Sequence, residues 1–351
     1  MKKILPKIIV IIGPTASGKT AMSLSLAKKL SAKGGPASGW HGEIVNADSR
    51  QVYNGMDIGT AKPKWDRSVS LRGVKRRPAC RQAGAITLLK QGDRHAPLRV
   101  ARDDIFNFLV NNIPHHLFDI ISPDEEFTLA HYKKTAIAVI KDILKRKKLP
   151  IVVGGTGLYI WALVDNLDIP EVAPDLVLRA ELEKMPLTEL IEKLKKVDPE
   201  SAGRVDLKNP RRVIRALEVA LSSGAFKPKK SPPIFDALQI GFNPPREELN
   251  RRINQRVEGQ IKDGLVDEVK TLAKKYSWNL PAMSGIGYRQ LRPYLEGRET
   301  LAEAIEAIKR DTRHYAKRQG TWFRRDKRMN WVNTEAEAEE LIRSFLKISN
   351  F

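Results

Sequence analysis

Apolar residues follow two different patterns along the first half of the chain. Short runs rich in apolar residues at 8–12, 43–47 and 149–153 have the length of buried strands. Apolar residues recur with helical spacing over 21–30 and 127–145. Strands that alternate with helices predict an α/β fold with a parallel sheet. Ligand sites in such folds lie at the carboxyl ends of the strands, so we look for function there.

The pattern changes after about residue 166 and predicts three segments. Residues 1–166 read as the first part of the α/β core. Residues 167–223 lack strand-like runs and show helical spacing, which predicts an inserted all-helical subdomain. Residues 224–351 return to the core with a strand at 237–242 and then continue as a long helical C-terminal portion over 246–325.

Composition restricts the partners. The chain has 62 Lys and Arg against 41 Asp and Glu, a net charge of +21, which favours a phosphate-rich partner over an uncharged one; a membrane surface is the rival. No apolar stretch is long enough to span a bilayer, and the first strand begins too early for a signal peptide, so we expect a soluble, cytoplasmic protein. A single cysteine excludes a disulfide within the chain.

The segment 64–112 is unusual. Between residues 64 and 102 it carries eleven Lys or Arg against two Asp, with weak periodicity. A solvated loop is the simpler interpretation, and a basic arm that binds nucleic acid is the alternative.

One motif predicts binding of a polyphosphate or diphosphate. It matches G-x-x-x-x-G-K-[ST] and lies between the first strand and the first helix, where backbone N–H groups and the helix dipole surround an anion. We expect Lys19 to reach the terminal phosphate oxygens and Thr20 to coordinate Mg²⁺. The motif consists of Gly13, Pro14, Thr15, Ala16, Ser17, Gly18, Lys19 and Thr20.

A carboxylate and two arginines complete the candidate chemistry. Asp48 ends the second strand and suits a general base, a Mg²⁺ ligand or a turn cap. The strand at 149–153 ends in glycines instead of the acid that ATP hydrolysis usually requires, which weakens an ATPase interpretation. Arg252 and Arg256 share a helix face and suit a diphosphate, an RNA backbone or simply solvent.

Near the C-terminus, residues 317–325 interleave cations with aromatic rings, a combination that suits RNA. We expect Trp322 to pack inside and the basic residues to face the partner. His115 and His116 precede a predicted strand, and their spacing favours structural polar contacts over metal binding.

Seven segments in this order resemble the tRNA dimethylallyltransferases, also called tRNA isopentenyltransferases, of the bacterial type. They cover nearly the whole chain except 64–112, which is longer here than the connection usual in the family. The segments are GPTASGKT (13–20), NADSRQVYNGMDIGTAKP (46–63), IPHHLFDI (113–120), VVGGTGLY (152–159), NPRRVIRALEV (209–219), SGIGYRQL (284–291) and KRQGTWFRRD (317–326).

The resemblance implies a P-loop NTPase-like fold and a Mg²⁺-dependent prenyl transfer. A dimethylallyl group would pass from dimethylallyl diphosphate to N6 of adenosine 37 in tRNAs that read codons beginning with U. Asp48 matches the family's base, and the phosphate loop would hold the diphosphate. The residues that match the catalytic positions are Asp48, Lys19, Arg256 and Thr156.

The resemblance also implies a tRNA surface. The helical insert 167–223 would hold the anticodon stem-loop, and we expect the enzyme to act as a monomer. The matching tRNA-contact positions are Asp48, Ser49, Arg50, Gln51, Arg211, Arg212, Arg215, Ser284, Gly285, Gly287, Tyr288, Arg289, Lys317, Arg318, Gln319, Thr321, Trp322 and Arg324.

Three other functions remain open at this point. A P-loop nucleotide kinase would explain the phosphate loop and Asp48, and an adenylate isopentenyltransferase would prenylate a small nucleotide. An RNA-binding protein without catalysis would need neither Lys19 nor Asp48. The basic C-terminal helices and the net charge favour a large RNA substrate over the first two.

Overall fold

The computed structural model describes residues 4–31, 41–66, 108–169, 172, 175–223 and 231–348. Most of the basic segment predicted at 64–112 therefore lies outside the described residues. The chain divides into two compact units, one formed by Met1–Val164 with Ile234–Phe351 and the other by Asp165–Pro233.

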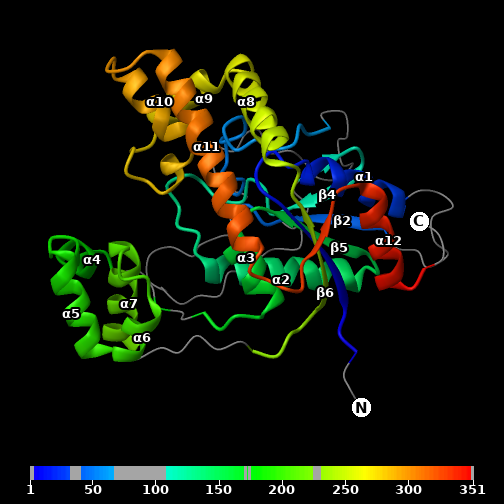
Figure 1. Cartoon of the computed structure of the whole chain (residues 1–351), viewed down its shortest axis with the longest axis horizontal. Helices are drawn as coiled ribbons and strands as arrows, with labels where there is room; N and C mark the ends of the chain where they lie inside the picture. Colours follow the sequence, from blue (N-terminus) through cyan, green and yellow to red (C-terminus); the bar gives the residue numbers. More distant parts are fainter. Residues whose placement is uncertain are drawn as a thin grey trace. The chain divides into compact units, whose positions relative to one another are not determined.

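The first unit is built on a seven-stranded sheet with the order β3-β4-β2-β5-β1-β6-β7 (Figure 1). All neighbouring strands are parallel except β3 and β4, which form an antiparallel edge, so the predicted α/β fold is confirmed with a mixed sheet. His115 and His116 lie within β4, although the sequence placed them before a strand. The strands are β1 (Lys7–Ile12), β2 (Gly42–Asn46), β3 (Phe108–Val110), β4 (Ile113–His116), β5 (Leu149–Gly154), β6 (Asp236–Phe242) and β7 (Asn330–Val332).

Helices cover both faces of this sheet. Successive residues of β1 alternate between the faces: Ile9 and Ile11 contact α1 (Lys19–Ser31) and α12 (Glu335–Leu346), whereas Ile8 and Val10 contact α2 (Leu129–Lys145) and α3 (Gly157–Val164). Because β1 is buried on both sides from Ile8 to Ile12, these five residues are all apolar and the strand is easily recognised.

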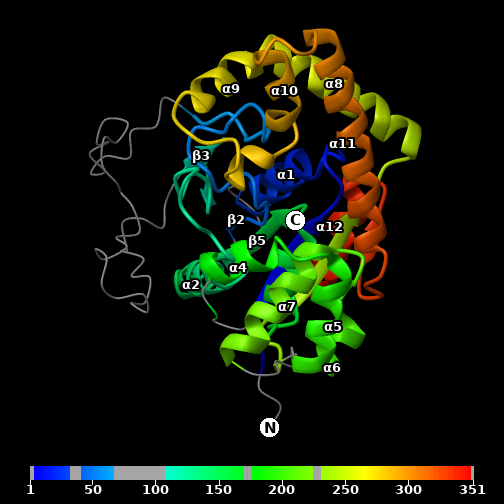
Figure 2. The same ribbon diagram turned by 90° about the vertical axis from the view of Figure 1, so that its left-hand side faces the viewer.

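The C-terminal helices form a further cluster of the same unit, seen in both ribbon views (Figures 1 and 2). The cluster contains α8 (Arg246–Lys262), α9 (Leu265–Ala273), α10 (Tyr288–Leu295) and α11 (Leu301–Phe323), and the short helix η2 (Ala282–Ser284). Their apolar side chains pack around Val52, Tyr53 and Met56, which follow β2. A capping box of Thr300 and Glu303 begins the 23-residue α11. The loop after β2 is therefore enclosed by helices that are distant in sequence.

The second unit is all-helical and has its own apolar core, which includes Leu190, Leu194, Val213 and Leu217. Its helices are α4 (Leu176–Leu182), α5 (Leu187–Val197), α6 (Pro199–Arg204) and α7 (Pro210–Ser223). No helix among the described residues is long and apolar enough to cross a membrane.

Candidate functional site

The candidate site lies where three neighbouring parallel strands end. β1 leads into the phosphate loop 13–20, β5 into Thr156 and β2 into Asp48. The Thr156 N–H donates to Ala47 O at 3.2 Å, and the Ser49 N–H donates to Thr156 Oγ1 at 3.0 Å. Since β5 pairs with both β1 and β2, the sheet brings these predicted residues to one edge.

The phosphate loop has the backbone that its motif requires and is fixed by helix α11. Ala16 and Gly18 have positive φ angles of 63° and 101°. The buried side chain of Gln319 accepts the Thr15 N–H at 2.8 Å and donates to Gly155 O at 2.8 Å. One amide thus joins the phosphate loop to the end of β5.

Two cations lie at this loop. The Arg256 guanidinium donates to Thr15 Oγ1 at 3.2 Å. Burial lowers the pKa of Lys19 to about 8, with Asp48 opposing the change and Arg256 adding to it. Burial also lowers the pKa of Arg256. Two buried cations near each other favour a bound anion, which supports a diphosphate site.

Arg252 has a different position from Arg256, although both lie on one face of α8. Its Nη1 donates to Ser17 O at 3.1 Å, and its Nε donates to Glu248 at 2.6 Å. The Arg252 guanidinium therefore supports the backbone of the phosphate loop, and Arg256 is the arginine that reaches a hydroxyl of the loop.

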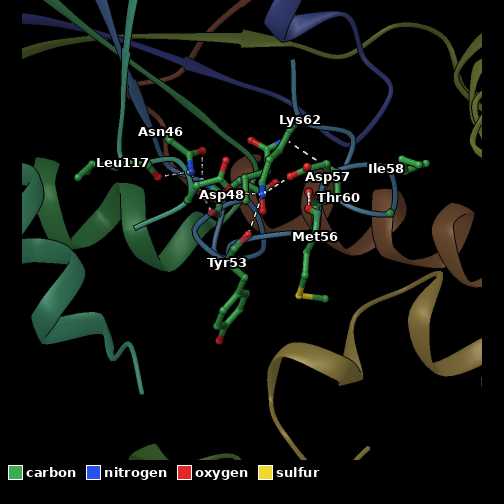
Figure 3. A network of polar contacts seen from close by, with 12 residues as sticks. Asn46, Asp48, Tyr53, Met56, Asp57, Ile58, Thr60, Lys62 and Leu117 are labelled. Atoms are coloured by element: carbon green, nitrogen blue, oxygen red, sulfur yellow. Dashed lines mark hydrogen bonds and ion pairs between the residues drawn. The ribbon is translucent and has the colours of Figure 1, made fainter. Parts of the chain in front are cut away.

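The backbone of Asp48 is held by Asn46, which sequence reasoning did not single out (Figure 3). Asn46 Oδ1 accepts the Asp48 N–H at 2.9 Å, and its Nδ2 donates to Leu117 O at 2.9 Å. The Tyr132 hydroxyl donates to Asn46 O at 3.1 Å. Asn46 is only 1% exposed, and a polar residue directly after the apolar Ile44 and Val45 of a buried strand is the sequence signal that could have identified it.

The Asp48 carboxylate has one oxygen engaged within its own turn. Oδ1 accepts the Arg50 N–H at 2.9 Å, and no described residue donates to Oδ2. Burial is the main reason that the pKa values of Tyr159 and Tyr315 are raised, and the negative charge of Asp48 adds to both. Oδ2 of Asp48 is therefore available to accept a hydrogen bond or a proton.

The donor set of this site fits Mg²⁺. Magnesium usually keeps several waters and takes only one or two protein ligands together with phosphate oxygens. The exposed Thr20 is the second residue of α1 and the last of the phosphate loop. The described residues contain no cluster of three or more His, Cys, Asp or Glu that would suit a metal held by protein alone.

The residues predicted to contact tRNA in the first unit fall into two groups. The structure places the side chains of Ser284, Arg289, Lys317, Arg318, Thr321 and Arg324 at the surface. Tyr288 and Gln319 differ from the expectation because they are 1% and 6% exposed. Gly285 and Gly287 are also buried, so these four support the surface from beneath.

Trp322 is half-buried and packs on the main core, as the sequence suggested. Its ring lies 4.6 Å from that of Trp161. Gly157 leaves the space for this indole, since a side chain there would collide with it.

In the helical unit, the three candidate arginines of α7 differ in their contacts. Arg211 is exposed. Arg212 pairs with exposed Asp206 at 3.2 Å, whereas Arg215 pairs with the fully buried Glu218 and donates to Val172 O. Arg215 is therefore committed to the fold of its unit more than Arg211 and Arg212.

The phosphate loop follows β1, and a carboxylate follows β2, which lies two strands away in the sheet. Together with the flanking cations, this arrangement defines a P-loop-type α/β enzyme that acts on a phosphorylated substrate. Comparison with known proteins refines this class. The family model described as IPP transferase matches residues 109–326. The tRNA dimethylallyltransferase of Roseiflexus castenholzii is 41% identical and that of Anoxybacillus flavithermus is 39% identical, over 95% and 93% of this chain and 94% and 90% of theirs.

Solved structures agree with these matches. The tRNA isopentenylpyrophosphate transferase of Bacillus halodurans has a TM-score of 0.61 and 34% identity, over 97% of this chain and 95% of that chain. A eukaryotic dimethylallyltransferase solved while acting on tRNA has a TM-score of 0.65 and 26% identity, over 90% of this chain and 69% of that chain. The chain belongs to the tRNA dimethylallyltransferase family, as its motifs predicted, and is a prenyl transferase with a P-loop NTPase-like fold.

Proposed function

We propose that the enzyme transfers a dimethylallyl group from dimethylallyl diphosphate to N6 of adenosine 37 in tRNAs that read codons beginning with U. The observation that carries this proposal is the position of Asp48 beside the phosphate loop, on strand ends joined through Thr156. A base and a diphosphate site at this edge of the sheet are the two groups that the reaction needs.

Asp48 is proposed to take the proton from N6 as the nitrogen attacks C1 of the dimethylallyl group. The amino group of adenine is a weak nucleophile, so removal of its proton must accompany bond formation. Oδ2 of Asp48 is the oxygen that accepts it, since Oδ1 already accepts the Arg50 N–H. The Thr156 hydroxyl, which accepts the Ser49 N–H and donates to Ser49 Oγ, would orient the incoming nucleotide.

The phosphate loop, with Lys19 and Arg256, would hold the diphosphate as the C1–O bond breaks. Preorganised cations stabilise the charge that develops on the leaving group, an effect that typically contributes several kcal/mol. Thr20, together with diphosphate oxygens and water, would hold Mg²⁺, which when bound supplies further charge neutralisation.

The target adenosine must leave its base stack to reach Asp48, which costs a few kcal/mol and is easiest in a loop. We propose the anticodon stem-loop as the RNA partner. The exposed cations of α10 and α11 and those of α7 would contact its phosphates. We propose that the enzyme acts as a monomer and that it works in the cytoplasm, where the proposed substrate is found.

The test uses purified protein, Mg²⁺, dimethylallyl diphosphate and unmodified bulk tRNA. After digestion of the RNA, mass spectrometry should detect N6-dimethylallyladenosine, and the same incubation with ATP and no prenyl donor should consume no ATP. Asp48→Asn should lower kcat by roughly 10²- to 10⁴-fold while tRNA binding changes little. Asp267→Asn, a change of an exposed acid on α9, is the matched control. An Asp48→Asn enzyme with normal kcat would refute the role of Asp48 as base.

A further inference from the structure

Helix α9 carries a carboxylate with an unusual set of partners. Glu268 Oε2 accepts the backbone N–H groups of Asp57 at 2.9 Å and Ile58 at 2.7 Å. Its Oε1 accepts the Gly59 N–H at 3.0 Å and the Tyr288 hydroxyl at 2.7 Å. Three successive backbone N–H groups form a concave anion site, or nest, and here the anion is a side chain about 210 residues further along the chain. We call residues 57–59 the nest.

The nest is fixed from its other side as well. Gln260 of α8 donates to Ile58 O at 2.5 Å and to Gly59 O at 3.3 Å. Gly59 lies flat against the Tyr288 ring, where a Cβ would come within 2.5 Å of the ring carbons. All three N–H groups of the nest, the carbonyl groups of Ile58 and Gly59, and the surface of Gly59 therefore contact α8, α9 or α10.

The nest belongs to a loop that is closed upon itself. The Lys62 side chain, only 1% exposed, donates to Tyr53 O at 2.7 Å and pairs with Asp57 and Asp119 (Figure 3). All three N–H groups of this ammonium are used, which ties both halves of the loop to the segment after β4.

The same loop begins with Asp48, the proposed catalytic base. Gln51 donates to Thr60 O at 3.0 Å and Ala61 O at 3.2 Å, so the start and the end of the loop are joined. Arg50 donates to Pro281 O at 2.5 Å and to Ser284 Oγ at 3.2 Å. A displacement of the nest would therefore also displace the residues next to Asp48.

We propose that Glu268 is a positioning residue that fixes the loop 48–62 against α9 and α10, and thereby sets the place of Asp48 relative to the tRNA-contact segment 284–289. The inference rests on the proposed function of Asp48. Glu268 would act in catalysis through this loop and not by touching substrate. The side chain must be a carboxylate, because both of its oxygens have to accept hydrogen bonds from the four donors, which are three backbone N–H groups and the Tyr288 hydroxyl. A glutamine would replace one oxygen with an NH₂ group that faces other donors.

The test compares Glu268→Gln with Asp267→Asn. Both changes remove one negative charge from the first turn of α9, but no described residue hydrogen-bonds the Asp267 carboxylate, which is exposed. The first readout is amide hydrogen exchange of the nest in the free enzyme. Exchange at 57–59 should accelerate roughly 10- to 100-fold in Glu268→Gln, as expected when charge-assisted hydrogen bonds are lost, and stay unchanged in Asp267→Asn.

The second readout is steady-state kinetics with each substrate varied. The kcat/KM for tRNA should fall roughly 10- to 100-fold in Glu268→Gln, because small misplacements of reacting groups have effects of this size. KM for dimethylallyl diphosphate should not change, because the phosphate loop does not contact Glu268, the nest or Tyr288. A purely structural role would lower the melting temperature without this selective loss.

The outcomes separate this inference from the proposed function. Unchanged exchange of the nest, or normal kcat/KM for tRNA with accelerated exchange, would overturn the role of Glu268. A fully active Asp48→Asn enzyme would refute the proposed base while the exchange result still tests the contact. If Glu268→Gln does not fold, Tyr288→Phe removes one of the four donors, and it should produce a smaller change of the same kind in both readouts.

Discussion

The buried ion-pair cluster at the start of β2 allows stability and catalysis to be separated. Glu43 is 4% exposed and contacts His116 Nε2 of β4 at 2.8 Å. Its two oxygens also accept Nη1 and Nη2 of Arg146, which follows α2. Burial raises the pKa of Glu43, but the hydrogen bonds from His116 and Arg146 outweigh it and hold the pKa at about 2.

The size of the effect follows from this pKa. A shift from 4.5 to about 2 corresponds to about 3 kcal/mol of stability at neutral pH, at about 1.4 kcal/mol per pKa unit. The Arg146 side chain is 30% exposed, so water screens part of the pair. We expect Glu43→Gln to lower the free energy of unfolding by about 2–3 kcal/mol and the Tm by roughly 4–8 °C.

The effect depends on pH with a definite sign. The folded-state pKa of Glu43 is depressed, so its stabilisation is present above about pH 4.5 and is lost as the pH falls toward about 2. The difference in stability between wild type and Glu43→Gln should therefore shrink by about 1 kcal/mol between pH 7 and pH 3.5.

Chemical denaturation at several pH values measures this difference, and initial rates with saturating tRNA and donor measure kcat. Asp142→Asn is the control, because Asp142 pairs with the same Arg146 at 2.8 Å with its side chain 25% exposed, as an i,i+4 pair of the kind that contributes about 0.3–0.5 kcal/mol. Asp48 lies five positions after Glu43, two residues beyond the end of β2 and roughly 15 Å away, so kcat should stay near the wild-type value. A Tm loss below about 1 °C, or a loss of kcat without a loss of stability, would refute the reasoning.

Three further results are expected. Replacement of 67–107 by a short Gly-Ser linker should leave Tm and turnover nearly unchanged, because Trp65 and Phe108 stack with 4.1 Å between ring centroids and hold the flanks together; a protein that no longer folds would contradict this. Arg256→Ala should raise KM for dimethylallyl diphosphate roughly 10- to 100-fold in steady-state assays and leave KM for tRNA unchanged. The kcat/KM for tRNA should fall steeply between about 50 and 200 mM salt, and a flat response would argue against phosphate contacts by Lys and Arg.

The parts of the fold that could be predicted are those in which local pattern and burial agree. Residues 8–12 of β1 are all apolar because helices cover both faces of the strand, and α7 shows its helical spacing clearly. The edge strands β3 and β7 contain three residues each, too few for a period to appear. Their pairing with β4 and β6 is decided by tertiary contacts, which no local pattern contains.

The functional site, like the fold, combines features that a local sequence pattern predicts with features that depend on tertiary contacts. The phosphate loop and Asp48 follow from a motif and a strand end, but the strand order that brings them together is not local. Glu268 could not be identified because an acid in the first turn of a helix is commonplace, and its three backbone donors leave no trace in side-chain identity. Residues that act by holding a backbone are thus systematically missed.

The glycines that end β5 explain why this phosphate loop lacks the carboxylate usual in ATP-hydrolysing relatives of the fold. A Cβ at Gly154 would collide with Ala47 O, and a Cβ at Gly155 would collide with Gln319 Nε2. No acidic side chain can therefore stand at the end of this strand. The space is used instead by α11, whose Gln319 joins Gly155 to Thr15 of the phosphate loop. The exposed Lys317 and Arg318 directly precede Gln319 on α11, so the helix that fixes the phosphate loop also carries part of the proposed tRNA surface. One helix would therefore position both proposed substrates.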